Sequence, residues 1–288
     1  MKRESFGSRL GFILVSAGCA IGIGNVWKFP YICGAYGGAA FILIYLCFLV
    51  ILGIPVLVAE FAVGRGSHTS VAKCFDKLAP AGSGWKPLKF IGIIGCYMLM
   101  MFYTTVGGWM IYYCVKSLRG DFVGATPEAV TQSFSDMLGN APTMMLWMVI
   151  ICLIGFAVCF MGLQNGIEKI SKVMMSALLI IMVILAVHSV MMEGAGEGIR
   201  FYLIPDFQKI KEAGVGNVVF AALSQSFFTL SIGIGAMLIF GSYLDKSRSL
   251  TGEAVSITVL DTFVALTAGF IIIPACFSYN LDVGAGPS

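Results

Sequence analysis

Long apolar stretches separated by short polar segments dominate this chain. A helix needs about 20 consecutive apolar residues to cross the hydrocarbon core of a bilayer, and about seven stretches of the chain meet this need. We expect spans over residues 9–30, 39–62, 90–114, 142–162, 170–191, 218–243 and 254–277. The pattern therefore predicts an all-α, polytopic membrane protein embedded in a lipid bilayer.

The centre of the first stretch is unsuited to a simple membrane anchor. Gly18, Gly22 and Gly24 each lower helix stability by roughly 1 kcal/mol relative to alanine, and Asn25 places a polar amide near mid-depth. Non-helical backbone at membrane depth is tolerated only where it is buried in protein or lines a cavity. The alternative is close helix packing, because Gly18 and Gly22 are spaced like a GxxxG face. This stretch alone leaves both interpretations open.

A second interruption lies in the sixth stretch, where hydroxyl groups, an amide and two glycines collect between Ser224 and Gly235. Spans one and six are separated by an odd number of crossings, so they run in opposite directions. Five-helix units that start at each would be inverted repeats, and paired Gly-interrupted segments indicate a transporter's midplane binding site. Unwound carbonyls can replace the hydration shell of sodium, and helix N-termini attract a carboxylate. We therefore expect a solute site between discontinuous helices 1 and 6.

Composition supports the membrane class and excludes several others. The chain is 58 % hydrophobic and 11 % charged, and its net charge of +3 is too small to indicate a nucleic-acid partner. Nine cysteines lie mostly in apolar runs, with only two histidines and no CxxC spacing, so a Cys/His metal site is not expected. No paired His or Asp residues at helical spacing suggest a membrane-embedded enzyme. We expect no enzymatic activity and no organic cofactor.

Lysine and arginine positions predict the orientation. If the N-terminus is cytoplasmic, the inside segments hold most of the basic residues, including the run Lys73, Lys77, Lys86 and Lys89. Cytoplasmic loops of membrane proteins carry such an excess. We expect a multi-pass protein of the cell (inner) membrane with its N-terminus in the cytoplasm.

Several motifs resemble one known family. They are SAGCAIGIGNVWKFPY (16–31), GGAAFILIYLCFLVILGIPVLVAEFAVGR (37–65), YTTVGGW (103–109), PDF (205–207) and SFFTLSIGIGA (226–236). Together they look like the neurotransmitter/sodium symporter family, in its bacterial amino-acid branch. The resemblance implies a fold of about eleven or twelve spans built as a 5+5 inverted repeat. Residues 1–191 would form the first repeat, and 192–288 an incomplete second repeat, truncated after the seventh span.

The resemblance also implies sodium ligands. The carbonyl of Ala20, the side chain of Asn25 and both oxygens of Thr229 match the first sodium site, which the substrate carboxylate would complete. Asn25 could in addition cap the helix where the chain restarts. The carbonyls of Gly18 and Ile21 match the second site, whose remaining ligands would come from an eighth span.

Asp261 is a carboxylate inside the seventh span, and such residues are functional candidates by default. Its position matches a family asparagine that ligates the first sodium. One helical turn later, at Ala265, chloride-independent members can carry an acid, and chloride-dependent members bind chloride there beside residues matching Tyr45 and Gln225. Asp261 could therefore be a sodium ligand or a chloride substitute.

A substrate pocket follows from the same resemblance. Tyr103 would donate its hydroxyl to the substrate carboxylate, although tyrosine in a span otherwise serves packing or the interface. Phe228 would form the lid, and Ile234 replaces an aromatic residue, which favours a medium or large apolar amino acid. The implied pocket residues are Cys19, Ala20, Gly22, Gly24, Leu99, Tyr103, Phe228, Thr229, Ser231 and Ile234.

Gate residues are partly present. Lys28 replaces the arginine of the outer gate, keeping the charge but losing the bidentate fork. The residues that match the cytoplasmic gate are Arg3, Phe6, Ser242 and Tyr243. Arg3 could simply reflect the basic inside loops, and Glu60 could be a solvated boundary charge or a partner for a first-span group.

These expectations lead to one main hypothesis, a sodium-coupled symporter for neutral or apolar amino acids that works by alternating access. Sodium would be the bound, co-transported ion, and a homodimer is possible. The alternatives are a non-transporting fragment, half of a split transporter, and a substrate-binding sensor.

Overall fold

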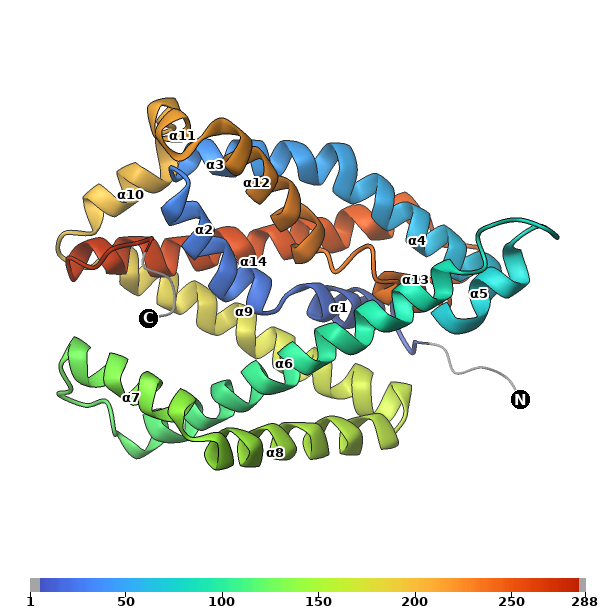
Figure 1. Ribbon diagram of the computed structural model, residues 1–288, viewed down its shortest axis with the longest axis horizontal. Helices are drawn as coiled ribbons and strands as arrows, with labels where there is room; N and C mark the ends of the chain where they lie inside the picture. Colours follow the sequence, from blue (N-terminus) through green and yellow to red (C-terminus); the bar gives the residue numbers. More distant parts are fainter. Residues whose placement is uncertain (1–5, 285–288) are drawn as a thin grey trace.

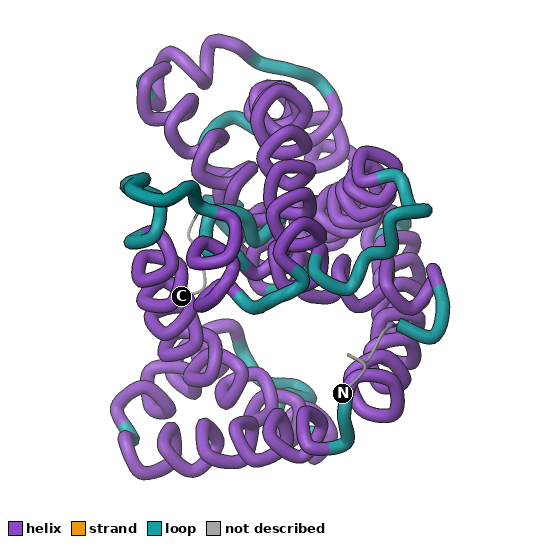
Figure 2. Tube along the Cα trace, turned by 90° about the vertical axis from the view of Figure 1, so that its right-hand side faces the viewer, coloured by secondary structure: helices purple, strands orange, loops and turns teal. Residues whose placement is uncertain are grey.

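The computed structural model describes residues 6–284, and within that range the chain forms helices and loops without a strand (Figures 1 and 2). In chain order the helices are α1 (Arg9–Ala20), α2 (Phe29–Ala35), α3 (Ala39–Phe48), α4 (Ile54–Ser67), α5 (Val71–Leu78), α6 (Leu88–Arg119), α7 (Pro127–Gly139), α8 (Ala141–Phe160), α9 (Lys169–Val190), α10 (Ala195–Leu203), α11 (Phe207–Ala213), α12 (Val215–Thr229), α13 (Ala236–Gly241) and α14 (Leu250–Ser278). Three π-helical segments join some of them: η1 (Gly24–Lys28), η2 (Leu49–Gly53) and η3 (Leu163–Glu168).

Five of the predicted spans are continuous helices in the described part of the chain. They cover Ala39–Ser67, Leu88–Arg119, Ala141–Phe160, Leu163–Val190 and Leu250–Ser278, each long and apolar enough to cross a membrane. Four of them are five to seven residues longer than predicted, chiefly because polar residues extend the helices beyond the apolar stretches, and Ala141–Phe160 is one residue shorter than the predicted 142–162. The prediction of these five spans is confirmed.

The first predicted span is a bent pair of helices. α1 ends at Ala20, and the chain resumes as η1 and α2 after a bend of 55°. Ser8 begins α1 by accepting a hydrogen bond from the backbone N–H of Gly11 at 3.0 Å. The predicted interruption around Gly22 is therefore present, and it divides the span near its middle.

The sixth predicted span is also divided. α12 covers 15 residues and α13 only 6, with turns between Leu230 and Gly235. Gly233 and Gly235 have φ angles of 91° and 76°, and Ser231 has a φ of 52°. Left-handed backbone is readily adopted by glycine and rarely by other residues, so the glycine pattern explains why the helix stops here.

Connecting segments contain short helices that the hydropathy pattern did not predict. α5 lies at the end of the molecule that also carries α13, whereas α7, α10 and α11 lie at the opposite end (Figure 1). The segment between the third and fourth spans includes the 13-residue helix α7. Thr126 starts α7 as its N-cap by accepting from the N–H of Ala129 at 3.3 Å, as threonine commonly does.

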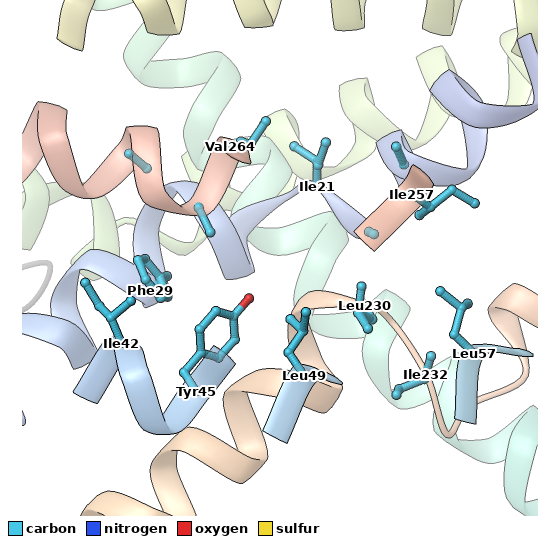
Figure 3. Packing of buried hydrophobic residues seen from close by; sticks show 14 of the residues in the cluster. Ile21, Phe29, Ile42, Tyr45, Leu49, Leu57, Leu230, Ile232, Ile257 and Val264 are labelled. Carbon is cyan, nitrogen blue, oxygen red and sulfur yellow. The ribbon is translucent and has the colours of Figure 1, made fainter. Parts of the chain in front are cut away.

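The apolar core lies where the two interruptions meet the second and seventh spans. Figure 3 shows Ile21 from the first break and Leu230 from the second in one cluster with Leu49 and Ile257. α14 runs through the middle of the molecule, between α9 and the helices of the first two spans (Figure 1). This arrangement buries side chains of α14 that a peripheral membrane helix would expose to lipid.

Candidate functional site

The two interruptions touch each other directly. Gln225 of α12 donates from Nε2 to the carbonyl of Gly24 at 2.8 Å, and Ser231 donates from Oγ to the carbonyl of Cys19 at 3.1 Å. Carbonyl groups freed by a helix break need partners when they are buried, and here side chains of the second break supply two of them. The breaks therefore form one structural unit.

A buried polar cluster lies beside this unit. Asp261 accepts from Nδ2 of Asn25 at 2.9 Å and from Oγ1 of Thr229 at 2.8 Å, one bond to each carboxylate oxygen. Asn25 Nδ2 also lies 3.1 Å from the backbone oxygen of Asp261. All three side chains are 0 % exposed. The three residues come from η1, α12 and α14, so the fold brings together groups that are up to 236 positions apart in the chain.

The other predicted sodium ligands lie at the end of α1. Ala20 and Ile21 are buried there, next to the break. Gly18 faces the fifth span, because a Cβ on it would lie 3.2 Å from Sδ of Met175. Gly22 faces the third span, because a Cβ on it would lie 3.8 Å from the ring of Tyr103. The two glycines thus face different helices and form no single GxxxG surface.

A cavity of about 530 Å³ opens beside the second break. Five of the ten predicted pocket residues line it: Leu99, Tyr103, Phe228, Ser231 and Ile234. The other predicted members, Cys19, Ala20, Gly22, Gly24 and Thr229, lie around the two breaks and not on the wall of this cavity. Sequence reasoning did not identify four further lining residues, Leu223, Ser224, Phe227 and Ile232. Of these, Ser224 lies four residues before the predicted Phe228 on α12, and this i,i+4 spacing is the signal that could have found it.

Glu60 of α4 stabilises the second break. Its two carboxylate oxygens accept from the backbone N–H groups of Gly233 at 2.6 Å and Leu238 at 3.2 Å. These groups lie just before and within the first turn of α13, where helix N–H groups lack intrahelical partners and favour a negative charge. Both interpretations of Glu60 from the sequence were therefore wrong, since its partner is the sixth span.

The two predicted chloride-site neighbours are fully buried. Tyr45 and Gln225 are 0 % exposed, and within the described residues the hydroxyl of Tyr45 and Oε1 of Gln225 have no hydrogen-bond partner. Tyr45 packs against Phe29 with ring centroids 5.2 Å apart (Figure 3). Each residue thus holds one unpaired polar atom inside the molecule.

The predicted gate residues lie at opposite ends of the first span. Lys28 places its ammonium group 4.1 Å from the centroid of the Phe228 ring, in a cation–π contact at the cavity wall. At the other end the rings of Phe6 and Tyr243 meet edge to face at 5.7 Å, and Ser242 lies buried next to Tyr243. Arg3 lies outside the described residues.

The described residues contain no group of three or more His, Cys, Asp or Glu side chains suited to a metal ion. Any cation at the breaks would therefore be held mainly by carbonyl, amide and hydroxyl oxygens, with Asp261 as the charged member. Such a set of oxygen donors suits a hard cation and not a transition metal.

Two interrupted spans meet in the middle of the molecule, beside a buried polar cluster and a cavity. This arrangement is typical of one class of protein, the secondary transporters. Within this class, a family model described as the sodium:neurotransmitter symporter family matches residues 3–128 and 127–280. The chain belongs to this family, whose members are sodium-coupled transporters and not enzymes.

Relatives and solved structures agree with this assignment. The uncharacterized sodium-dependent transporter YhdH of Bacillus subtilis (strain 168) is 36 % identical over 287 residues, which are 100 % of this chain and 62 % of YhdH. An uncharacterized sodium-dependent transporter of Haemophilus influenzae is 32 % identical over 100 % of this chain and 64 % of its own length. The crystal structure of MhsT in complex with L-phenylalanine superposes with a TM-score of 0.91 at 38 % identity, covering 99 % of this chain and 64 % of MhsT. The chain therefore spans a little less than two thirds of the length of these relatives.

Proposed function

We propose that the protein is a sodium-coupled symporter for neutral, medium or large apolar amino acids, working by alternating access. The observation that carries the proposal is the contact of Asn25 and Thr229 with Asp261, directly beside the two breaks and near the cavity. A buried carboxylate that meets only neutral donors is costly unless a cation accompanies it. Sodium would supply that cation, and its ligands are residues of both interrupted spans.

The side-chain amide of Asn25 carries an acceptor oxygen on one side and an NH₂ donor on the other. With Nδ2 toward Asp261, the amide stabilises the carboxylate; after a rotation of 180°, its oxygen would face the same space and could bind sodium. The carbonyl of Ala20 and the hydroxyl of Thr229 would complete the oxygen set. Gly18 and Ile21 would contribute carbonyls to a second sodium site.

An amino acid would lie in the cavity with its carboxylate toward the breaks. Tyr103 would donate its hydroxyl to that carboxylate, while Leu99, Phe228 and Ile234 would contact the side chain. MhsT was crystallised with L-phenylalanine, which supports a large apolar substrate for a chain that shares its fold. Because sodium and the substrate carboxylate would share one site, each ligand raises the affinity of the other.

The wider organisation belongs to the same proposal. Residues 1–191 form the first five-span repeat and 192–288 begin the inverted second repeat, with the N-terminus on the cytoplasmic side of the cell membrane. A homodimer is compatible with the extensive apolar surface of α6 and α8, although lipid covers such surfaces equally well.

Uptake of a labelled amino-acid panel into proteoliposomes, with and without an inward sodium gradient, tests the proposal. We expect sodium-dependent uptake of phenylalanine, leucine or related amino acids. Sodium-dependent binding without uptake would instead favour the sensor or a transport-incompetent fragment. The absence of both binding and uptake in a folded protein would contradict the proposal.

A further inference from the structure

Two buried carboxylates hold the segment that leads into the first span. Glu168, the last residue of η3, accepts from the backbone N–H of Gly7 at 2.8 Å and from Oγ of Ser8 at 3.3 Å. Glu253, in the first turn of α14, accepts from Nε of Arg9 at 2.9 Å. The start of α1 is thus tied to both the fifth and the seventh span, at the end of the molecule that carries α5 and α13 (Figure 1).

Arg9 and Glu253 differ strongly in their exposure to solvent. The side chain of Glu253 is 3 % exposed, whereas that of Arg9 is 51 % exposed. Within the described residues, the second carboxylate oxygen of Glu253 is buried without a hydrogen-bond partner. Removing one member of a buried ion pair is strongly destabilising because the other charge stays buried and unpaired. Glu253 therefore depends on Arg9, while Arg9 can turn to water.

Apolar packing of α1 begins at Phe12 and Leu14, which are buried in the core, and is incomplete before them. A cavity of about 110 Å³ separates it from the neighbouring spans, lined by Phe12, Leu244 and Asp245 as well as by the ion pair. Phe6 touches Phe12 and Tyr243 only by ring edges, with centroids 5.5 and 5.7 Å away. Polar contacts to the two carboxylates therefore hold Gly7, Ser8 and Arg9, whereas the rest of α1 is held by apolar packing.

The far end of α1 adjoins the break in the first span. Ile21 and Gly22 are not helical, and the axis changes by 55° between α1 and the continuation of the span. A rotation of α1 about this break would require the release of its contacts with Glu168 and Glu253 as well as of its apolar contacts with the core. Gly11 allows the close approach of Glu168, since a Cβ at this position would overlap the carboxylate.

We propose that Arg9 and Glu253 form a charge latch that holds α1 closed at this end of the molecule, with Glu168 and Lys172 positioning the segment beside it. Lys172 supports Glu168 through an ion pair of 2.6 Å. The inference rests on the proposed function, because opening at this end is one half of alternating access. Glu253 is a positioning residue in this scheme and touches neither ion nor substrate.

Thiol labelling at Leu244 tests the latch. Leu244 is 5 % exposed and lines the cavity, so Leu244→Cys in a variant without the native cysteines reports when α1 lifts. The labelling rate is measured without sodium or amino acid, in purified protein, for Arg9→Gln, Arg9→Lys, Glu253→Gln and the double variant Arg9→Gln/Glu253→Gln. Asp245→Asn is the matched control, because Asp245 is an exposed acid on the same cavity that forms no ion pair within the described residues.

We expect Arg9→Gln to label at least about tenfold faster, because it leaves a buried carboxylate unpaired. The double variant should be slower than Arg9→Gln, and Arg9→Lys and Asp245→Asn should stay close to the parent. If Arg9→Gln does not fold, Glu253→Gln serves as the test. We expect its labelling rate to rise about threefold, because a neutral amide accepts a weaker hydrogen bond from Arg9 than a carboxylate does.

Equal labelling rates in the parent, Arg9→Gln and Glu253→Gln would overturn the latch, as would an increase of the same size in Asp245→Asn. A merely structural effect would lower the unfolding temperature of Arg9→Gln without restoring slow labelling in the double variant. Because labelling requires no transport, a protein that shows the expected order but takes up no amino acid would refute the proposed function and leave the latch in place.

Discussion

Within the described residues, both oxygens of Asp261 meet neutral donors, the amide of Asn25 and the hydroxyl of Thr229. Burial from water makes the ionised form of this carboxylate costly unless a cation accompanies it. The two donors orient it without neutralising it, which leaves a strong local preference for a small cation. The same two residues are those that the resemblance implies as sodium ligands.

Asn25→Ala should weaken sodium binding and, through it, substrate binding. The variant removes the oxygen that we propose as a sodium ligand and leaves Asp261 short of one hydrogen bond, a loss of about 1–3 kcal/mol, or roughly 5- to 150-fold in affinity. Sodium titrations of amino-acid binding measure both effects. Unchanged sodium dependence would rule out Asn25 as a ligand.

Asp261→Asn separates the two roles considered for this residue. As a sodium ligand, asparagine keeps an oxygen in place, so binding should persist at altered sodium affinity and without a need for chloride. As a chloride substitute, loss of the charge should make binding or uptake depend on added chloride. Replacing chloride by gluconate in the assay distinguishes them, and the exposed Asp245→Asn serves as the control.

At the scale of single residues, the sequence predicted which residues form the polar cluster but not the hydrogen bonds between them. Asn25, Thr229 and Asp261 stand out as polar groups inside apolar spans, which are rare, and the family resemblance implies that they are sodium ligands. The contacts of Glu60 with Gly233 and Leu238 were missed, because nothing in a single sequence tells which helix end a boundary acid will meet.

At the scale of elements, two glycines at the break in the first span have different surroundings. A Cβ on Gly24 would lie 2.9 Å from the ring of Phe228, whereas on Gly22 its nearest neighbour would be the Tyr103 ring at 3.8 Å. Gly24→Ala should therefore displace Phe228 from the cavity wall at a cost of about 1–3 kcal/mol. Gly22→Ala, the matched control, should have a much smaller effect on amino-acid affinity. Equal affinities in the two variants would contradict this account.

α5 offers a measurement outside the membrane spans. Cys74 is buried against Val71 and Leu238, and burial raises the pKa of its thiol above its ordinary value. Because the thiolate is the reactive form, Cys74 should react slowly with a maleimide at pH 7 and faster only as the pH rises. Ala72→Cys on the exposed side of the same helix should react at ordinary rates at pH 7. Equal rates at pH 7 would show that α5 does not pack as described.

Hydropathy predicted the long spans and both interruptions, because glycine and polar residues break an otherwise continuous apolar pattern. It did not predict α5 and α7, since both lie in segments of mixed polarity where capping residues such as Thr126 and local packing decide the structure. Hydropathy marks where a chain enters lipid and says little about helices that lie outside it.

The molecule as a whole has two chemically different ends. α5 and the start of α1 lie at one end and α10 and α11 at the other (Figure 1), and the basic residues predict that the first end is cytoplasmic. In a cysteine-free background, a membrane-impermeant thiol reagent applied to intact cells should label Lys211→Cys on α11 and not Lys73→Cys on α5. Both side chains are exposed, so the reverse pattern would invert the proposed orientation.

The π-helical segment η2 interrupts the second span between Tyr45, which faces the first break, and Glu60, which binds the second. One extra residue in a helix rotates everything beyond it by roughly 100° about the axis, because a turn contains 3.6 residues. The angle about the helix axis between the side chains of Tyr45 and Glu60 is therefore set by the one extra residue within Leu49–Gly53. Removing one residue there would turn Glu60 away from α13 while leaving the length and apolar character of the span almost unchanged.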